Sequence, residues 1–250
     1  MKQNYTKKYE SMKVAGEILY VVLQELKDLA KPGVTTDTLD KYAESRILEL
    51  GGLPSFKGFN GFPSSLCASI NHDLVHCIPA KKKLKKGDIL SIDLGVQHGG
   101  FHTDSAITFG IDSISTEAKN LLSVTKTALK MGIEKAIVGN TTNDIATAIQ
   151  DYFESKKLSV VRDLVGHGIS KDIHESPYIP NFKTKPPHHI LTLGQTIAIE
   201  PMVTLVNPKL TRSEDGYGYA MADGNISAHF EHTIIILKDG PEVLTTKHDR

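Results

Sequence analysis

Five residues whose side chains commonly bind metals are distributed along apolar stretches of this chain. They are four carboxylates and one imidazole: Asp93, Asp104, His167, Glu200 and Glu231. Each lies in a stretch that we predict to be a strand or a strand edge. A carboxylate inside an apolar strand is costly unless a partner offsets its charge. Singly, each could be an edge aspartate or a structural histidine, but together they favour a site for two divalent cations.

Two of these carboxylates belong to one predicted hairpin, which spans residues 88–109. The dipeptide Gly99-Gly100 can form a two-residue turn with positive φ. Such a turn would place Asp93 opposite Ala106 and Asp104 two residues from that pair. Because side chains alternate along a strand, both aspartates would project from the same face. One could then chelate a cation while the other bridges two.

The C-terminal part offers a similar acidic pair. Glu200 and Glu231 lie on two predicted strands that are joined by a long polar loop. Pro201 follows Glu200 directly and cannot donate to a ladder, so we expect a bulge or a sheet edge there.

The elements that must position these residues recur along the chain. Two predicted helices precede the hairpin, and another pair, beginning with a helix over 115–138, follows it. The helix-opening segments at Gly33 and Gly139 are offset by 106 residues, which carries Asp93 to one residue before Glu200. We interpret this as two related halves, about 10–110 and 115–238. Helix caps are common enough that the match could also arise by chance.

Composition narrows the class of protein. The chain has 250 residues, of which 40% are hydrophobic and 23% charged, as in a globular protein with a sizeable core. Its formal net charge of zero gives no bulk attraction to nucleic acid. It shows neither an apolar run of roughly 20 residues nor an apolar signal region. The two cysteines form no Cys-x-x-Cys pair, which excludes a zinc ribbon. We expect a cytoplasmic protein with no membrane partner.

Short segments around the five residues resemble the type I methionine aminopeptidases. They are residues 71–79, 87–93, 103–104, 166–169, 174–177, 199–202 and 230–233. The resemblance runs from about Met12 to Lys238 and implies the α+β pita-bread fold. That fold has two pseudo-symmetric halves, a central antiparallel sheet and helices packed outside. The chain lacks the insertion of type II enzymes and the N-terminal domain of prolidases, so we expect a single catalytic domain, residues 1–250, acting as a monomer.

The resemblance implies a role for each metal ligand. Asp93 would chelate one cation, His167 and Glu200 would hold the other, and Asp104 and Glu231 would bridge the two. Cobalt, manganese, iron or zinc would suit this ligand set.

The reaction implied is removal of an N-terminal methionine from nascent or short peptides with a small second residue. The two cations would activate a hydroxide for attack on the first carbonyl. Glu200 would take the proton from the water as general base. His174 would donate to the developing oxyanion, and His76 would contact the scissile amide. Outside these motifs, both histidines would be interpreted as ordinary loop residues.

The resemblance also locates a methionine pocket, formed by Phe56, Phe59, Phe62, Cys67 and Ile173. Two phenylalanines stand where tyrosines are usual, and the loop 206–225 lacks the tryptophan common in the family. An apolar wall still suits a thioether. One methylene is worth only about 1–3 kcal/mol of discrimination, so we expect reduced stringency for methionine. The aromatic residues could also be ordinary core.

Other interpretations stay open at this point. The same fold could serve an X-Pro aminopeptidase or a non-catalytic binding protein. Cys77, which replaces the family's glycine after His76, could mark a cysteine hydrolase, although adjacent strand residues point in opposite directions. His229 and His232 flank Glu231 and could support it or face outward.

One strongly basic run, Lys81–Lys86, stands out from the otherwise balanced charge of the chain. It could be a solvated loop. The family's co-translational role implies a second possibility, contact with ribosomal RNA near emerging N-termini.

Overall fold

A computed structural model describes residues 2–248, so Met1, Asp249 and Arg250 of the predicted domain lie outside the described residues. The helices are α1 (Lys2–Leu29), α2 (Thr36–Glu49), α3 (Thr116–Glu134) and α4 (Thr142–Ser155), with a 3₁₀ turn η1 (Phe59–Gly61). The strands of the first half are β1 (Leu53–Pro54), β2 (Leu66–Ile70), β3 (Asp73–Val75), β4 (Ile89–His98) and β5 (Phe101–Gly110). Those of the second half are β6 (Ser159–Val160), β7 (Gly166–Gly168), β8 (Glu175–Ile179), β9 (Thr196–Ile199), β10 (Met202–Thr204), β11 (Leu210–Arg212), β12 (Tyr219–Met221), β13 (Ser227–His229), β14 (His232–Leu237) and β15 (Gly240–Val243).

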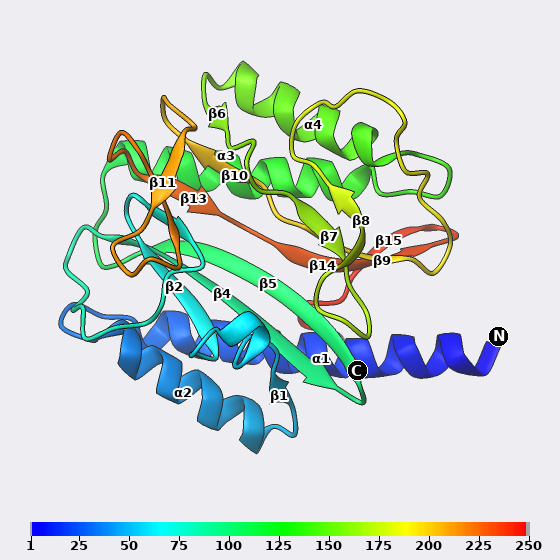
Figure 1. Ribbon diagram of the computed structural model, residues 1–250, viewed down its shortest axis with the longest axis horizontal. Coiled ribbons are helices and arrows are strands. Elements are labelled where there is room, and N and C mark those ends of the chain that lie inside the picture. Colours follow the sequence, from blue (N-terminus) through cyan, green and yellow to red (C-terminus); the bar gives the residue numbers. More distant parts are fainter. Residues whose placement is uncertain (1, 249–250) are drawn as a thin grey trace.

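The first half packs α1 and α2 against an antiparallel sheet of β1, β2, β4 and β5. In Figure 1 these two helices lie below the strands. The long strands β4 and β5 pair over their whole length, from Ile89–Gly110 to His98–Phe101. Gly99 and Gly100 close the hairpin with φ of 59° and 84°, values that suit glycine.

The second half packs α3 and α4 against the sheet β15-β14-β9-β7-β8 and the smaller sheet β13-β10-β6. These helices lie above the strands in Figure 1. The helix α3 ends at Glu134, four residues before the end that we predicted at Val138. Ala136 is still buried, but Ile137 and Val138 are 41% and 48% exposed, so most apolar side chains of a further helical turn would have no packing to hold them.

The two halves repeat each other in backbone detail. α4 begins and ends 106 residues after α2, and the capping residues Thr35 and Thr141 each form an isolated β-bridge. Further along, the offset becomes 107. The Lys85 N–H donates to Asp88, and 107 residues later the Thr192 N–H donates to the side chain of Gln195. The second half therefore has one added residue before this point. With the offset of 107, Asp93 corresponds to Glu200 itself rather than to the residue before it.

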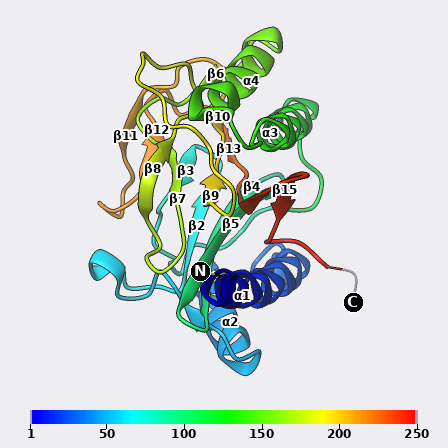
Figure 2. The same ribbon diagram turned by 90° about the vertical axis from the view of Figure 1, so that its right-hand side faces the viewer.

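The halves meet along β5 and the strands β13 and β14, which lie side by side in Figures 1 and 2. Side-chain hydroxyls bridge the seam between them. Ser105 Oγ donates to the Glu231 carbonyl over 2.6 Å, and Thr233 Oγ1 donates to the Asp104 carbonyl over 2.8 Å. The Asp104 N–H in turn donates to Thr233 Oγ1 over 2.9 Å. The hydroxyls extend the sheet across the seam, where two predicted ligands lie.

The helices have one buried face each rather than an apolar circumference. α3 and α4 bury Leu121, Ile149 and Phe153 against the second half. None of the helices within residues 2–248 is both long enough and apolar enough to span a bilayer.

Candidate metal centre

The fold gathers the five predicted ligands from separate strands. Asp93 comes from β4, Asp104 from β5 and His167 from β7, whereas Glu200 follows β9 and Glu231 lies between β13 and β14. Ligand atoms of the trio Asp93, Asp104 and Glu231 all lie within 4.8 Å of one another. Those of His167, Glu200 and Glu231 do so as well. Glu231 therefore belongs to both trios.

The hairpin places its two aspartates as the two-residue turn predicts. Asp93 pairs with Ala106, and Asp104 pairs with Gly95, two residues along the same ladder. Both carboxylates therefore point to one face of the sheet.

The two glutamates lie where the chain crosses from one sheet to another. Glu200 and Pro201 separate β9 from β10, which pair with different partners. Glu231 separates β13 from β14 in the same way. Pro201 therefore stands at a break between strands, as its missing N–H led us to expect.

The buried carboxylates are short of partners. Asp93 Oδ1, Asp104 Oδ1 and Glu231 Oε1 are buried, and no hydrogen-bond partner is found for them among the described residues. Burial raises the pKa of Asp93, Asp104, Glu200 and Glu231 above the ordinary range. Neighbouring carboxylates raise the pKa of the last three further. Such a group ionises readily only when a cation offsets its charge, so the residues fit divalent metal.

His167 is oriented as a neutral ligand. Its Nδ1 lies 2.9 Å from the carbonyl oxygen of Gly168, which can only accept, so Nδ1 carries the proton. Its Nε2 lies 3.5 Å from Glu200 Oε1. Burial, together with a smaller effect of the nearby His174, lowers the pKa of His167 to about 3. The free lone pair of Nε2 therefore faces the carboxylates.

His229 is a member of the site that the sequence left undecided. It is 1% exposed, and its Nε2 lies 3.7 Å from Glu200 Oε2. Neither ring nitrogen has a hydrogen-bond partner among the described residues, and burial lowers the pKa of His229 to about 3. His232 instead lines a separate groove, with Nδ1 2.9 Å from Thr245 Oγ1. Strand side chains alternate, so the sequence could have indicated that His229 shares the face of Glu231 and that His232 points to the other face.

A cavity of about 220 Å³ opens beside the acidic cluster. The residues that line it besides the five ligands are Phe56, Phe59, Asn60, Phe62, Cys67, His76, His174 and Tyr217. Its walls are therefore largely aromatic and its floor is acidic. Ile173, which we predicted in the wall, is not among the residues that line this cavity, although it belongs to the same buried cluster as Phe56, Phe62 and Cys67.

Tyr217 is a wall residue that the sequence reasoning missed. It comes from the segment between β11 and β12, and its hydroxyl donates to the Asn60 carbonyl over 2.8 Å. Its ring packs edge-on against Phe62, with centroids 5.5 Å apart. An aromatic residue in an otherwise polar loop was the only signal in the sequence.

Two histidines flank the acidic cluster. The His174 ring stands nearly perpendicular to that of His167, with centroids 4.4 Å apart, and partial burial lowers its pKa. His76 packs edge-on against Tyr219, and burial lowers its pKa to about 4, helped by His174. Both imidazoles are therefore neutral near pH 7.

Cys77 does not face this cavity. It is 4% exposed, and its Sγ lies 3.5 Å from Ser213 Oγ. Burial raises the pKa of its thiol to about 11, which disfavours the thiolate that a cysteine hydrolase needs.

Comparisons with known proteins agree with this geometry. The model of metallopeptidase family M24 matches residues 10–238. The methionine aminopeptidase of Clostridium perfringens is 47% identical, and methionine aminopeptidase 1 of Bacillus subtilis 44%, each over 94% of this chain and of its own. The crystal structure of methionine aminopeptidase from Thermotoga maritima superposes with a TM-score of 0.93 at 36% identity, covering 96% of this chain and 97% of that one.

A more distant structure shares the fold alone. Xaa-Pro dipeptidase from Bacillus anthracis has a TM-score of 0.78 at 20% identity, and the match covers 97% of this chain but 61% of that one. The predicted pita-bread fold is thereby confirmed. By its sequence, its fold and its acidic cluster, the chain belongs to metallopeptidase family M24.

Proposed function

We propose that this protein is a methionine aminopeptidase, which hydrolyses the first peptide bond of nascent or short peptides that begin with methionine and a small second residue. One observation carries the proposal: buried carboxylate oxygens without partners form the floor of a cavity with aromatic walls. Such a cavity suits one apolar side chain, with the bond to be cut held at the acidic floor. We also propose a cytoplasmic, monomeric enzyme.

The proposed centre holds two divalent cations. Asp93 would chelate one, His167 and Glu200 would hold the other, and Asp104 and Glu231 would bridge them. Three groups of ligand atoms support this division: two share Glu231, and a third joins Asp104 to His167 and His174, so each bridging carboxylate lies near ligands of both cations. When bound, the cations supply Lewis acidity and a water of lowered pKa. Cobalt, manganese, iron and zinc all fit these donors.

The protein's own groups would then direct the proton transfers. Glu200 accepts the proton of the attacking water and passes it to the nitrogen of the leaving amine. His174 donates an N–H to the carbonyl oxygen as negative charge develops there. His76 contacts the scissile amide. Both histidines are suited to this because, as neutral imidazoles, they can donate one N–H each.

The substrate side chain would enter between Phe59, Phe62 and Tyr217. These rings and Cys67 offer apolar surface to a flexible thioether, which makes favourable contacts with aromatic edges. The relatives above 40% identity are named methionine aminopeptidases, whereas the Xaa-Pro dipeptidase is only 20% identical to this chain. These observations favour methionine over an X-Pro substrate.

The test is hydrolysis of Met-Ala-Ser and of Ala-Pro-Ser by metal-free protein resupplied with one metal at a time. We expect methionine release from the first peptide with at least one metal. A Glu200→Gln variant should lose at least about 10²–10⁴-fold in kcat, because it removes the general base and also one ligand of a cation. Cleavage of Ala-Pro-Ser alone would favour the X-Pro aminopeptidase. No cleavage with any metal would favour the non-catalytic binding protein.

A further inference from the structure

His76 lies in a backbone conformation that must be held from outside. Its φ is 60°, in the left-handed region that a residue with a side chain seldom adopts. Such a conformation is strained and persists only where neighbouring contacts fix it. The residues around His76 therefore determine where its imidazole points.

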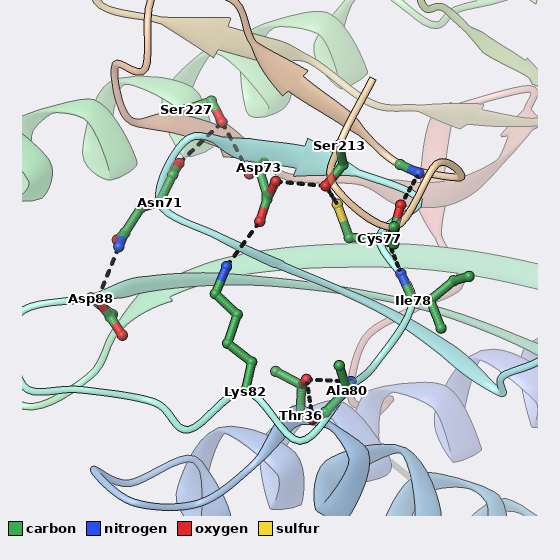
Figure 3. Close-up of polar contacts among 12 residues, drawn as sticks. Thr36, Asn71, Asp73, Cys77, Ile78, Ala80, Lys82, Asp88, Ser213 and Ser227 are labelled. Carbon is green, nitrogen blue, oxygen red and sulfur yellow. Dashed lines mark hydrogen bonds and ion pairs between the residues drawn. The ribbon is translucent and has the colours of Figure 1, made fainter. Parts of the chain in front are cut away.

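The segment that follows His76 is tied at two backbone amides (Figure 3). The Ile78 N–H donates to Asp215 Oδ2 over 2.6 Å, and the Ala80 N–H donates to Thr36 Oγ1 over 2.9 Å. The preceding residue, Val75, pairs with Tyr219 at the end of β3. Directly after His76, the Cys77 carbonyl accepts the Ala68 N–H over 3.0 Å. The bond of the Ile78 N–H to Asp215 comes next, and it is the first contact downstream of His76 that a side chain makes with a backbone N–H.

The two oxygens of Asp215 have different tasks. Oδ1 accepts the N–H groups of Tyr217 and Gly218, each over 2.8 Å, and so closes the turn of its own loop. Oδ2 accepts the Ile78 N–H. One carboxylate thereby joins the turn that carries Tyr217 of the pocket wall to the segment that carries His76.

Close packing supports this joint. A Cβ added to Gly218 would lie 2.4 Å from the Sγ of Cys77, so the loop sits directly on the residue after His76. Ser213 Oγ donates to Asp73 Oδ1 over 2.9 Å from the same loop (Figure 3). Cys77 fills the space that the absent side chain of Gly218 leaves.

We propose that Asp215 is a positioning residue for the reaction: through its bond to the Ile78 amide it holds His76 at the scissile amide while it shapes the pocket wall at Tyr217. The inference rests on the proposed function, since His76 acts only if a peptide bond is cut. It predicts that loss of the Oδ2 acceptor alone displaces His76.

The variant Asp215→Asn isolates that acceptor. An asparagine keeps Oδ1 for the turn but places an NH₂ group, which cannot accept, at Ile78. Asp223→Asn is the matched control, because Asp223 caps the same long loop through the N–H groups of Asn207 and Asn225. Asp215→Asn should speed amide exchange at Ile78 at least about tenfold, since a bond to a charged group is lost. Asp223→Asn should leave that exchange unchanged.

The kinetic arm uses a double-mutant cycle. With Met-Ala-Ser, Asp215→Asn should lower kcat about tenfold and change KM by less than about twofold, as expected for an interaction made in the transition state. In a His76→Ala background the same change should cost nothing further, because Asp215 acts through His76. Additive losses, an unchanged kcat, or unchanged exchange at Ile78 would each overturn the proposal.

The two proposals fail in different ways. If the wild-type protein cleaves no peptide with any metal, the proposed function is overturned, and the exchange at Ile78 still decides whether Asp215 holds this segment. If the wild type is active and Asp215→Asn keeps full kcat, only the positioning role is overturned.

Discussion

The Nε2 atom of His229 lies 3.7 Å from the Oε2 atom of Glu200, inside the protein and beside the acidic cluster. Glu200 thus has an imidazole near each carboxylate oxygen, His167 near Oε1 and His229 near Oε2. Both imidazoles are neutral near pH 7, because burial lowers each pKa to about 3. At 3.7 Å the two atoms are adjacent but not hydrogen-bonded, so a neutral His229 lies beside Glu200 without adding positive charge, and its N–H would donate to the carboxylate only over a shorter distance.

Replacing His229 by phenylalanine keeps the ring volume and removes the donor. We expect about 10–100-fold lower metal affinity or kcat/KM, the usual cost of losing a group that orients a ligand. His229→Gln, which retains an N–H donor, should recover most of the loss. Calorimetric metal titration and peptide kinetics on both variants measure this. Equal metal affinity and equal kcat/KM in His229→Phe and the wild type would contradict it.

Metal removal should destabilise the protein more at pH 8 than at pH 5.5. The folded-state pKa of each acidic ligand lies above its unfolded value of about 4. In metal-free protein such a group favours folding fully only below about pH 4, and this contribution is lost as pH rises through the raised pKa. Bound cations reverse that loss by stabilising the ionised forms.

Thermal unfolding with EDTA and with saturating metal tests this pH dependence. A metal at 100 times its Kd adds about 2.7 kcal/mol, which corresponds to a Tm shift of about 5–10 °C for a chain of this size. His167, with a pKa of about 3, is already neutral at pH 5.5 and does not account for the difference. A metal-dependent shift that is equal at both pH values would show that the carboxylates ionise normally without metal.

The aromatic pocket should accept residues other than methionine. We expect Leu-Ala-Ser and norleucine-Ala-Ser to be cleaved within about 10–200-fold of Met-Ala-Ser, because small apolar differences discriminate by about 1–3 kcal/mol. Tyr217→Ala should raise KM for all three peptides by opening the wall, whereas Tyr217→Phe should lose only the bond to Asn60. A strict methionine preference would reject the reduced stringency.

Ribosome contact through Lys81–Lys86 stays a prediction that the structure helps to test. Lys82 lies 3.4 Å from Asp73 and Lys86 lies 3.4 Å from Asp112, so these two have structural partners. Reversing the exposed Lys81, Lys83 and Lys85 to glutamate should abolish salt-sensitive co-sedimentation with ribosomes. Peptide hydrolysis should stay unchanged. Unaltered co-sedimentation would indicate an ordinary solvated loop.

Turn type and strand alternation were sufficient to predict how Asp93 and Asp104 are arranged. A two-residue glycine turn and strand alternation define the relation of Asp93 to Asp104 within one hairpin. The meeting of Glu200 with Glu231 depends on two crossings between sheets, so only the family resemblance could bring them together. The predicted end of α3 was wrong because the apolar pattern continues through Ile137 and Val138, whose side chains are exposed.

The missed residues lie in irregular connections. Tyr217 and Asp215 belong to a loop whose path depends on contacts with distant residues, Asn60 and Ile78. His229 was ambiguous because alternation gives its side of the strand but not what lies there. The positions of Tyr217, Asp215 and His229 all depend on tertiary packing, which local sequence patterns do not reveal.

The pairing of β10 with β13 brings the ends of segment 205–226 together, with Thr204 opposite Ser227. Residues 205–226 lie outside the sheet of β6, β10 and β13, and both ends of the segment are fixed at neighbouring positions of that sheet. The spacing of Glu200 and Glu231 is therefore independent of how long that excursion is or what it contains. The segment can therefore be exchanged without moving the metal ligands. A stretch from a relative that keeps the acceptor of Asp215 for the Ile78 N–H should transfer substrate preference and leave both the ligands and His76 in place.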